Sequence, residues 1–370
     1  MGSLSPQAVS GRHRTERSSG FAHLASLAAA SSPGSGAVPA RGAGAGVGVL
    51  TGASAMVCVG GSVAVSSVLT DAPLFTAQAV RYTVACLLLL AFARMSGRRL
   101  VMPRGPEWLW LLGVAATGLV LFNIALVAGA RHAEPAVLGV AVACVPLILA
   151  VLAPLLEGRR PSLGVLAAAL VVTCGAALVQ GLGRSDVVGL AWAVVVMCCE
   201  AGFTLLAVPV LGRHGPWGVS VHTTWLAAAV FAGLGVVREG PAAAAHLRLQ
   251  DLLAIAFLAV AVTAVAFVLW YSSVGRLGAG RAGLLTGVAP VAAAAAGVAL
   301  GAAPPRPLVW LGIAVVAAGL TLGLPKSRRP VRSRSEDQVA RLSASPPPLI
   351  DCRGEVCGAR VAPHEQDEGH

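Results

Sequence analysis

Four polar side chains interrupt long apolar stretches of this sequence, and each has a chemistry that apolar neighbours cannot supply: Arg81, Asn123, Glu200 and His222. If these stretches cross a bilayer, a charge near its middle costs at least about 2.5 kcal/mol, so a retained charge points to a function. A carboxyl group can exchange a proton and an imidazole can relay it. A guanidinium or an amide can bind an anionic or amide group of a solute. The residue types therefore favour solute binding and proton coupling.

Helix geometry predicts two depths for these side chains. With a rise of about 1.5 Å per residue, Glu200 and His222 lie about 20 Å and 22 Å from the outer face, so a contact between them is geometrically possible. Arg81 and Asn123 lie about 10 Å and 8 Å from that face and form a separate outer polar layer. The alternative is structural: Glu200 and His222 join two helices by a hydrogen bond, and Arg81 extends toward headgroups or water.

The elements that must position these residues are membrane-spanning helices. Of the 370 residues, 56% are hydrophobic and only 12% are charged, against about 25% charged in a soluble domain. Apolar runs long enough to cross a bilayer occur ten times. They cover residues 46–69, 74–93, 108–128, 135–156, 162–182, 187–211, 217–237, 252–274, 279–302 and 307–324. We expect an all-α integral membrane protein with about ten transmembrane helices.

Charge indicates orientation and excludes other partners. The net charge of +11 is spread along the chain, which argues against nucleic-acid binding. With a cytoplasmic N-terminus, the inner loops and the start of the C-terminal tail hold 14 Lys and Arg residues and the outer loops hold five. This bias places both termini in the cytoplasm. The tail residues Cys352, Cys357, His364 and His370 are poorly spaced for zinc, so we expect no metal and no cofactor.

An offset of 144 residues superposes one half of the apolar region on the other. It aligns Gly139 with Gly283, Pro146 with Pro290 and Gly175 with Gly319, and the helix boundaries agree. Each half holds five helices, an odd number, so the second half enters the membrane from the opposite side and the repeat is inverted. The expected organisation is a disordered N-tail, a first repeat, a second repeat and a disordered basic and mixed-charge C-tail, covering 1–45, 46–182, 187–324 and 325–370.

Over roughly residues 48 to 324 the sequence resembles the EamA-like, two-repeat branch of the drug/metabolite transporter superfamily. The resemblance rests on a combination of residues, namely Pro73 with Arg81, Asn123, Ala130-Arg131, Pro146, Glu157 with Arg159, Leu269-Trp270-Tyr271, Arg276-Leu277-Gly278-Ala279 and Pro290. It implies a permease that moves small metabolites or drugs, usually outward, through a cavity between the repeats. The acidic residue that the family pattern expects after the ninth helix is missing, since that stretch runs from Leu300 to Pro304 without one.

Four further residues are expected to matter for transport. Trp270 and Tyr271 either line the cytoplasmic mouth of the cavity or belong to an interfacial aromatic belt. Pro146 and Pro290 occupy equivalent repeat positions, where a bend suits alternating access.

The sequence therefore predicts a secondary transporter, not an enzyme, in a bacterial cytoplasmic membrane. It exports a small-molecule solute by alternating access, with proton coupling through Glu200 as a hypothesis. The alternatives are a facilitative metabolite or amino-acid permease and a membrane sensor or scaffold that transports nothing. The expected partners are the solute, the lipid bilayer and protons. Monomer and homodimer both stay open.

Overall fold

In the computed structural model of the protein, the described residues are 43–62, 65, 69, 72–181, 183–301 and 305–324. The two tails predicted for residues 1–45 and 325–370 lie outside them, apart from residues 43–45. The helical part forms one compact unit.

The described residues form ten helical crossings. Five belong to the first half: α2 (Ala43–Gly61), α4 (Leu74–Met95), α5-η2-α6 (Glu107–Val114, Ala115–Leu121, Phe122–Gly129), α7-α8 (Pro135–Ala143, Val145–Leu156) and α9 (Leu163–Gln180). Five belong to the second: α10 (Val187–Leu205), α11 (Val208–Arg238), α12-η4-α13 (Leu249–Phe257, Leu258–Val265, Ala266–Leu277), α14-η5-α15 (Ala279–Leu284, Leu285–Gly287, Val288–Ala299) and α16 (Pro307–Gly323). A short 3-10 turn, η3 (Ala243–His246), precedes α12.

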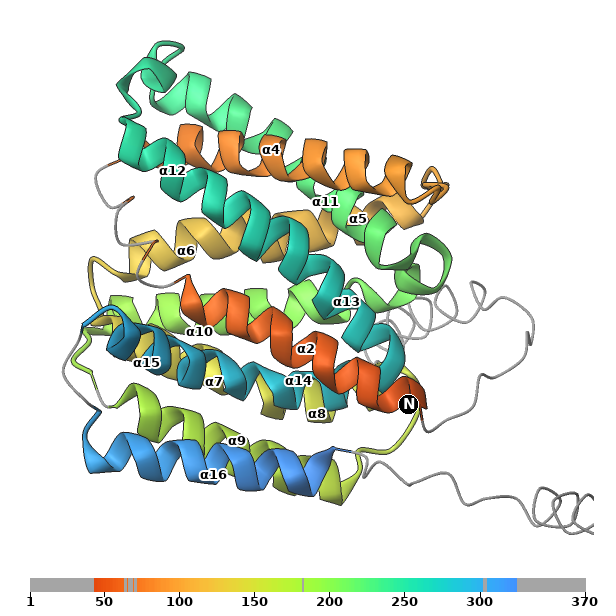
Figure 1. The fold of residues 1–370 in the computed structure, drawn as a ribbon, viewed down its shortest axis with the longest axis vertical. Coiled ribbons are helices and arrows are strands. Elements are labelled where there is room, and N and C mark those ends of the chain that lie inside the picture. The colour runs from red at the N-terminus through yellow and green to blue at the C-terminus, as the bar shows by residue number, and fades with distance from the viewer. Residues whose placement is uncertain are drawn as a thin grey trace, which may run out of the picture. The chain divides into compact units, whose positions relative to one another are not determined.

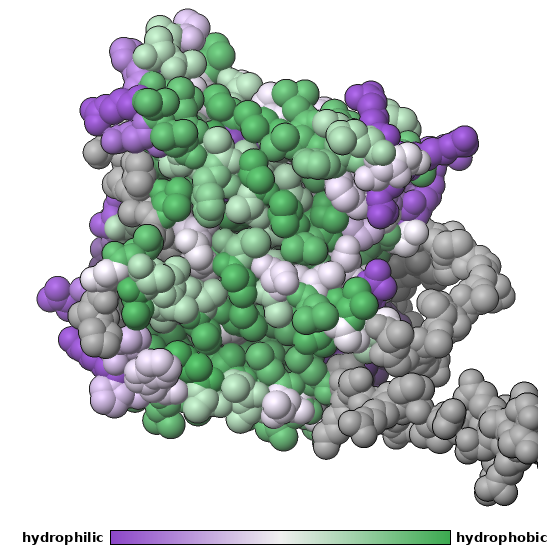
Figure 2. Space-filling model, in the orientation of Figure 1, coloured by the Kyte–Doolittle hydropathy of each residue, from purple (hydrophilic) through white to green (hydrophobic). Residues whose placement is uncertain are grey.

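Among the described residues, nine of these crossings are long and apolar enough to span a membrane, and α16 is a shorter apolar helix of 17 residues. Helices satisfy their own backbone hydrogen bonds, which is the condition for lying in lipid. Figure 2 shows apolar side chains across the middle of the visible face and hydrophilic ones toward two opposite ends. The predicted all-α membrane fold is confirmed.

Helix pairing follows a two-fold pattern. Among the most extensive helix contacts are those of α9 with α16, α4 with α11, α2 with α13, and α6 with α10. The first two pairs join equivalent helices of the two halves, and the last two pairs exchange under the 144-residue offset. A pseudo-two-fold axis between inverted halves produces this pattern. Figure 1 shows α9 and α16 side by side at one edge of the bundle and α4 and α11 at the other.

Glycine allows the closest of these approaches. A Cβ added to Gly312 of α16 would lie 2.7 Å from the carbonyl oxygen of Gly175 of α9. Backbone atoms cannot yield as a flexible side chain can, so a larger residue here would separate the helices. The α9–α16 contact therefore depends on Gly312 and on Gly175, which the repeat comparison had aligned with Gly319.

We name the two ends of the bundle by the chain. The terminal end is where the described chain begins and finishes, and it carries the loops at 96–106, 157–162 and 206–207. The distal end is the opposite one. Helix α11 runs from the terminal to the distal end, where Glu239 follows it. Because ten crossings bring the chain back to its starting side, the described chain both begins and ends at the terminal end.

Carboxylates tie the helices together at the distal end. Glu239 accepts hydrogen bonds from the backbone N–H groups of Phe75 and Thr76, at 2.9 Å and 2.8 Å, and from the Thr76 hydroxyl at 2.7 Å. It thereby satisfies N–H groups of the first turn of α4, in the other half of the molecule. The α4–α11 pair is therefore joined between halves at this end.

A second distal contact links the loop before α7 to the loop before α10. Glu134 accepts a 2.9 Å hydrogen bond from Arg184, which lowers the pKa of the Glu134 carboxyl. Asp186 accepts one from the Gly189 N–H and a second from His132, and in that order these lower the pKa of Asp186. Both carboxylates are thus held in their charged form, where they pair best.

One predicted boundary differs from the structure. The sequence predicted a sixth helix to residue 211 and a seventh from 217, whereas α10 ends at Leu205 and α11 already begins at Val208. Within α11 the backbone breaks at Gly215, which has φ 64° and ψ 175°, and continues at Pro216. Glycine tolerates a positive φ and proline begins a new helical turn, so this pair makes a sharp kink rather than a loop. Residues 208–214 therefore form a separate helical arm.

Candidate functional site

Arg81 lies in a polar network that joins both halves of the molecule. Its Nε donates to the Thr263 hydroxyl in η4 at 3.0 Å, and its Nη1 donates to the Gln78 side-chain oxygen at 3.4 Å. Gln78 in turn donates to the Asn123 side-chain oxygen in α6 at 2.9 Å. The structure thus brings Arg81 and Asn123 together through Gln78. We call Gln78, Arg81, Tyr82, Asn123 and Thr263 the Arg81 network.

Asn123 is fixed by its neighbours. Its Nδ2 donates to the Tyr82 hydroxyl at 3.0 Å and to the Leu119 carbonyl oxygen at 2.6 Å. Both N–H groups of the amide are therefore used, and its oxygen already accepts from Gln78. Asn123 was predicted to bind the solute beside Arg81. In this conformation its contacts are those of a residue that positions Gln78 and Tyr82.

Arg81 keeps donors to spare. A guanidinium has five N–H groups, and in the described structure two of them make hydrogen bonds, both to neutral oxygens. Among the described residues, the ion pairs do not include Arg81. The Arg81 guanidinium also lies 5.3 Å from the ring centroid of Tyr82, whose ring stacks on Phe231 at 5.7 Å. The result is a positive charge within the helix bundle that is oriented by neutral groups and has no ion-pair partner among the described residues.

Two π-helical segments frame this network. η2 (Ala115–Leu121) precedes Asn123, and η4 (Leu258–Val265) contains Thr263. They lie at equivalent positions of the two repeats, since the 144-residue offset carries one onto the other to within a residue. A π segment shifts the side chains that follow it around the helix and is common at functional sites. The same irregularity thus points residues of both halves into one network.

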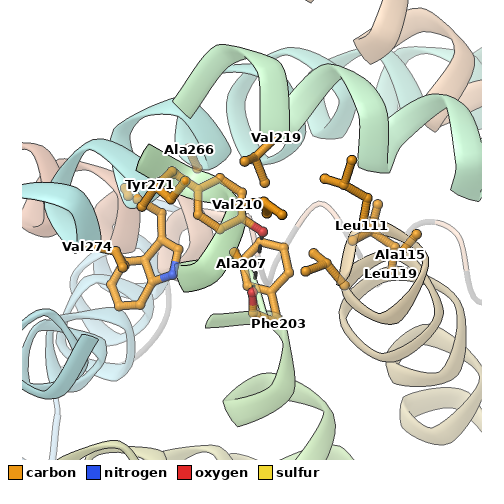
Figure 3. Packing of buried hydrophobic residues seen from close by; sticks show 14 of the residues in the cluster. Leu111, Ala115, Leu119, Phe203, Ala207, Val210, Val219, Ala266, Tyr271 and Val274 are labelled. Carbon is orange, nitrogen blue, oxygen red and sulfur yellow. Dashed lines mark hydrogen bonds between the residues drawn. The ribbon is translucent and has the colours of Figure 1, made fainter. Parts of the chain in front are cut away.

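Glu200 is a half-buried carboxyl group on α10. Within the described part of the chain its side chain makes no hydrogen bond or ion pair. Its one close electrostatic neighbour besides Cys199 is the hydroxyl of Tyr271 on α13. Figure 3 shows Tyr271 beside Phe203, one turn along α10 from Glu200, and the Tyr271 hydroxyl donates weakly to the Phe203 carbonyl oxygen at 3.4 Å. Glu200 is therefore a carboxyl group with no polar side-chain partner in the described part of the chain.

His222 belongs to a different cluster, and the contact with Glu200 that its depth suggested is not made. Its Nε2 donates to the Val101 carbonyl oxygen at 3.0 Å, and its Nδ1 accepts from the Trp225 indole at 3.4 Å. Both ring nitrogens are therefore occupied in the neutral form. The physical reason is the kink before Pro216, which directs this part of α11 toward the 96–106 loop. Depth alone could not reveal the direction of the side chain.

Of the two aromatic residues expected at the cavity mouth, the structure places one there. A cavity of about 470 Å³ opens at the terminal end, and Tyr271 lines it together with Glu157, Ser272 and Arg276. Trp270 is buried, and its indole donates to the Thr204 hydroxyl of α10 at 3.1 Å. Trp270 therefore joins α13 to α10 and does not line this cavity.

Both predicted hinge prolines follow interruptions of their helices. Pro146 is the second residue of α8, directly after the break at Cys144 that separates α7 from α8. Pro290 lies at the start of α15, after the 3-10 turn η5 (Leu285–Gly287). A proline lacks the N–H that would bridge such a break. Equivalent helices of the two repeats are thus interrupted at equivalent points.

Sequence reasoning missed three members of the Arg81 network. Gln78 lies three residues before Arg81 on a predicted helix, so their proximity was readable from the spacing, whereas Tyr82 follows Arg81 directly and that spacing predicts no shared face. Thr263 gave no such signal, because threonine is common in membrane helices and hydrogen-bonds to its own backbone, as Thr263 does to the Leu258 carbonyl oxygen.

Comparison with known proteins agrees with this geometry. The model of the EamA-like transporter family matches residues 46–180 and again residues 187–324. The uncharacterized transporter YetK of Bacillus subtilis is 24% identical over 286 residues, which cover 75% of this chain and 87% of that protein. A solved crystal structure with 21% identity has a TM-score of 0.66 and covers 78% of this chain and 100% of its own; it is similar in fold.

The family model is matched twice, each match covers about one half of the helical region, and together the matches span most of the chain. Nine candidate spans and a shorter apolar helix in the described residues agree with a multi-pass membrane protein. The chain belongs to the EamA-like transporter family and is a membrane transporter.

Proposed function

We propose that this protein is a secondary transporter that exports a small anionic metabolite or drug by alternating access. The observation that carries the proposal is the Arg81 guanidinium, which lies between helices of both halves, is oriented by neutral partners and has N–H groups to spare. A carboxylate or phosphate of a solute would pair with those N–H groups. The solute crosses the membrane chemically unchanged.

Tyr82 is the second donor to the solute in this proposal. Its hydroxyl oxygen accepts from Asn123, so its own O–H is free to donate. Asn123, Gln78 and Thr263 orient Tyr82 and Arg81 and are positioning residues. The site is thereby selective for an acceptor-rich, negatively charged group.

Two differences between the ends of the bundle support alternating access. The terminal end has the 470 Å³ cavity with Glu157 and Arg276 in its wall. The distal end is tied by Glu239 and by the Asp186 and Glu134 contacts, and the cavity of about 370 Å³ between α7 and α10 on that side is lined by apolar residues and glycines. A transporter that opens to one side at a time has one open and one closed end. We propose that the repeats, 46–182 and 187–324, rock about the breaks before Pro146 and Pro290. This motion would close the terminal end and open the distal end.

The orientation and the coupling complete the proposal. The excess of arginine in the loops of the terminal end favours a cytoplasmic terminal end in a bacterial membrane, with both tails on that side. The conformation described is then open to the cytoplasm. Glu200, which has no described ion-pair partner, would take up and release the coupling proton, so that solute export and proton import alternate. His222, with both nitrogens occupied, takes no part in this relay.

The proposal is tested by measuring the transport of solutes that differ in charge. Purified protein in liposomes is supplied with mono- and dicarboxylates, amino acids, organic cations and neutral sugars, with and without an imposed pH gradient. We expect saturable flux of at least one anionic solute. Flux of cations alone would contradict the anion site. Anion flux that ignores the pH gradient would favour a facilitative permease, and no flux of any solute would favour a sensor or scaffold.

A further inference from the structure

The helical arm at residues 208–214 has two different sides. On one side, Val208, Leu211 and Gly212 line the terminal-end cavity, together with Pro216 directly after the kink. On the other, Arg213 and His214 contact Glu107 at the start of α5, in the other half of the molecule. The arm is therefore both a wall of the cavity and a bridge between the halves.

Glu107 gathers three donors on one carboxylate oxygen. Its Oε2 accepts from the Arg104 backbone N–H at 2.8 Å, from Nη1 of Arg213, and from Nε2 of His214 at 3.2 Å. The Glu107 side chain is 18% exposed and that of His214 is fully buried. Removing one partner of a partly desolvated ion pair leaves the other charge unpaired, which is costly.

The His214 ring is fixed on its other face as well. It packs edge-on against His222 with 5.5 Å between the ring centroids, and His222 is itself bound to Val101. The Nδ1 atom of His214 is buried and has no hydrogen-bond partner among the described residues. An unpaired buried acceptor is costly. The arm is thus held in this position although one of its polar atoms is unsatisfied.

The arm has a joint at its end. Gly215 has φ 64°, and a Cβ added to Gly212 or to Gly215 would meet no atom within 4 Å. Figure 3 shows Ala207 and Val210, near the start of the arm, between Tyr271 on one side and Leu111 on the other, and these residues belong to one buried cluster. The start of the arm is therefore packed, while its glycine end has room to turn.

We propose that Glu107, Arg213 and His214 form a latch that holds the arm open as a wall of the terminal-end cavity, and that releasing this latch lets the glycine end of the arm, from Gly212 to Gly215, move into the cavity and close it. Glu107 is a positioning residue in this mechanism: it acts through Arg213 and His214 and touches no solute. The inference rests on the proposed function only in assigning closure to the transport cycle, because the latch itself is a property of the solute-free protein.

Hydrogen exchange of the full-length protein in lipid nanodiscs, without solute, tests the latch. In Glu107→Gln, and independently in Arg213→Gln, we expect the backbone amides of residues 208–216 to exchange about tenfold faster than in the wild type. The exchange of residues 226–238, in the distal part of α11, should stay unchanged. Glu134→Gln is the matched control, because it removes a carboxylate with a comparable arginine partner at the distal end.

Glu107→Asp keeps a carboxylate that can accept from Arg104, Arg213 and His214, so we expect it to keep the exchange of residues 208–216 closer to the wild-type rate than Glu107→Gln does. Unchanged exchange of the arm in both single variants would overturn the latch, and so would an equal increase in Glu134→Gln. Because no solute is present, such a failure is distinct from a failure of the flux experiment.

Discussion

Replacing Arg81 with glutamine is expected to lower the flux of the anionic solute about a hundredfold and to weaken its binding to a similar degree. Removing one partner of a buried, hydrogen-bonded charge pair costs on the order of 2–5 kcal/mol, and each 1.4 kcal/mol is about a factor of ten. Glutamine keeps hydrogen-bonding groups but loses the charge. Binding is measured by calorimetry in detergent and flux in liposomes.

Two further variants make this test specific. Arg81→Lys retains the charge but presents a point charge in place of the planar group that donates to Thr263 and Gln78, so we expect an intermediate loss. Arg131→Gln removes an exposed arginine at the distal end and should leave flux unchanged. Equal flux in Arg81→Gln and the wild type would show that the anion binds elsewhere.

Replacing Glu200 with glutamine is expected to remove the response of transport to a pH gradient while leaving solute exchange in place. A gradient of one pH unit supports up to about a tenfold accumulation ratio for each proton exchanged. Glutamine cannot take up a proton, so the ratio in Glu200→Gln should fall to about one. Accumulation of radiolabelled solute in liposomes with imposed gradients measures this ratio.

The control for the second variant is Asp251→Asn, since Asp251 is a distal carboxylate that only caps its own helix by accepting from the Arg248 backbone N–H, which asparagine can also do. It should keep the accumulation ratio of the wild type. A Glu200→Gln protein that still accumulates solute in response to the gradient would assign proton coupling to another group.

The number and type of helices were predictable from the sequence because apolar runs of spanning length are its strongest signal. The two prolines were also identified from the sequence, because Pro146 and Pro290 aligned in the repeat comparison. In the structure each of them follows a helix break. Arg81 and Glu200 stood out because charges are rare in such runs. These features are local, and they depend on length, spacing and residue type.

Side-chain direction was not predictable. His222 and Glu200 have similar predicted depths, yet His222 binds the backbone of Val101, a residue 121 positions away. The side chain of His222 follows the kink at Gly215. From the sequence we placed Gly215 and Pro216 between two predicted helices, 187–211 and 217–237, and so expected a loop there. The π segments were equally hidden, because η2 and η4 consist of the same apolar residues as the helices around them.

The latch could not have been predicted for the same reason. Glu107 lies at the start of a predicted helix, where an acidic residue usually interacts with the helix dipole and needs no other explanation. Only the fold brings Arg213 and His214 of the other half to its carboxylate. Contacts between the repeats depend on how the helices pack against one another. A single sequence does not show which face of each helix meets which neighbour, so these contacts could not be predicted.

The central claim is that one anion site serves both faces of the membrane in turn. Counterflow in liposomes tests it most directly: vesicles preloaded with unlabelled anionic solute are diluted into a trace of the same labelled solute. Alternating access predicts transient uptake of label that is several-fold above the uptake of empty vesicles, that saturates with concentration and that is lost in Arg81→Gln. Uptake that ignores the preload and rises linearly with concentration would contradict the account.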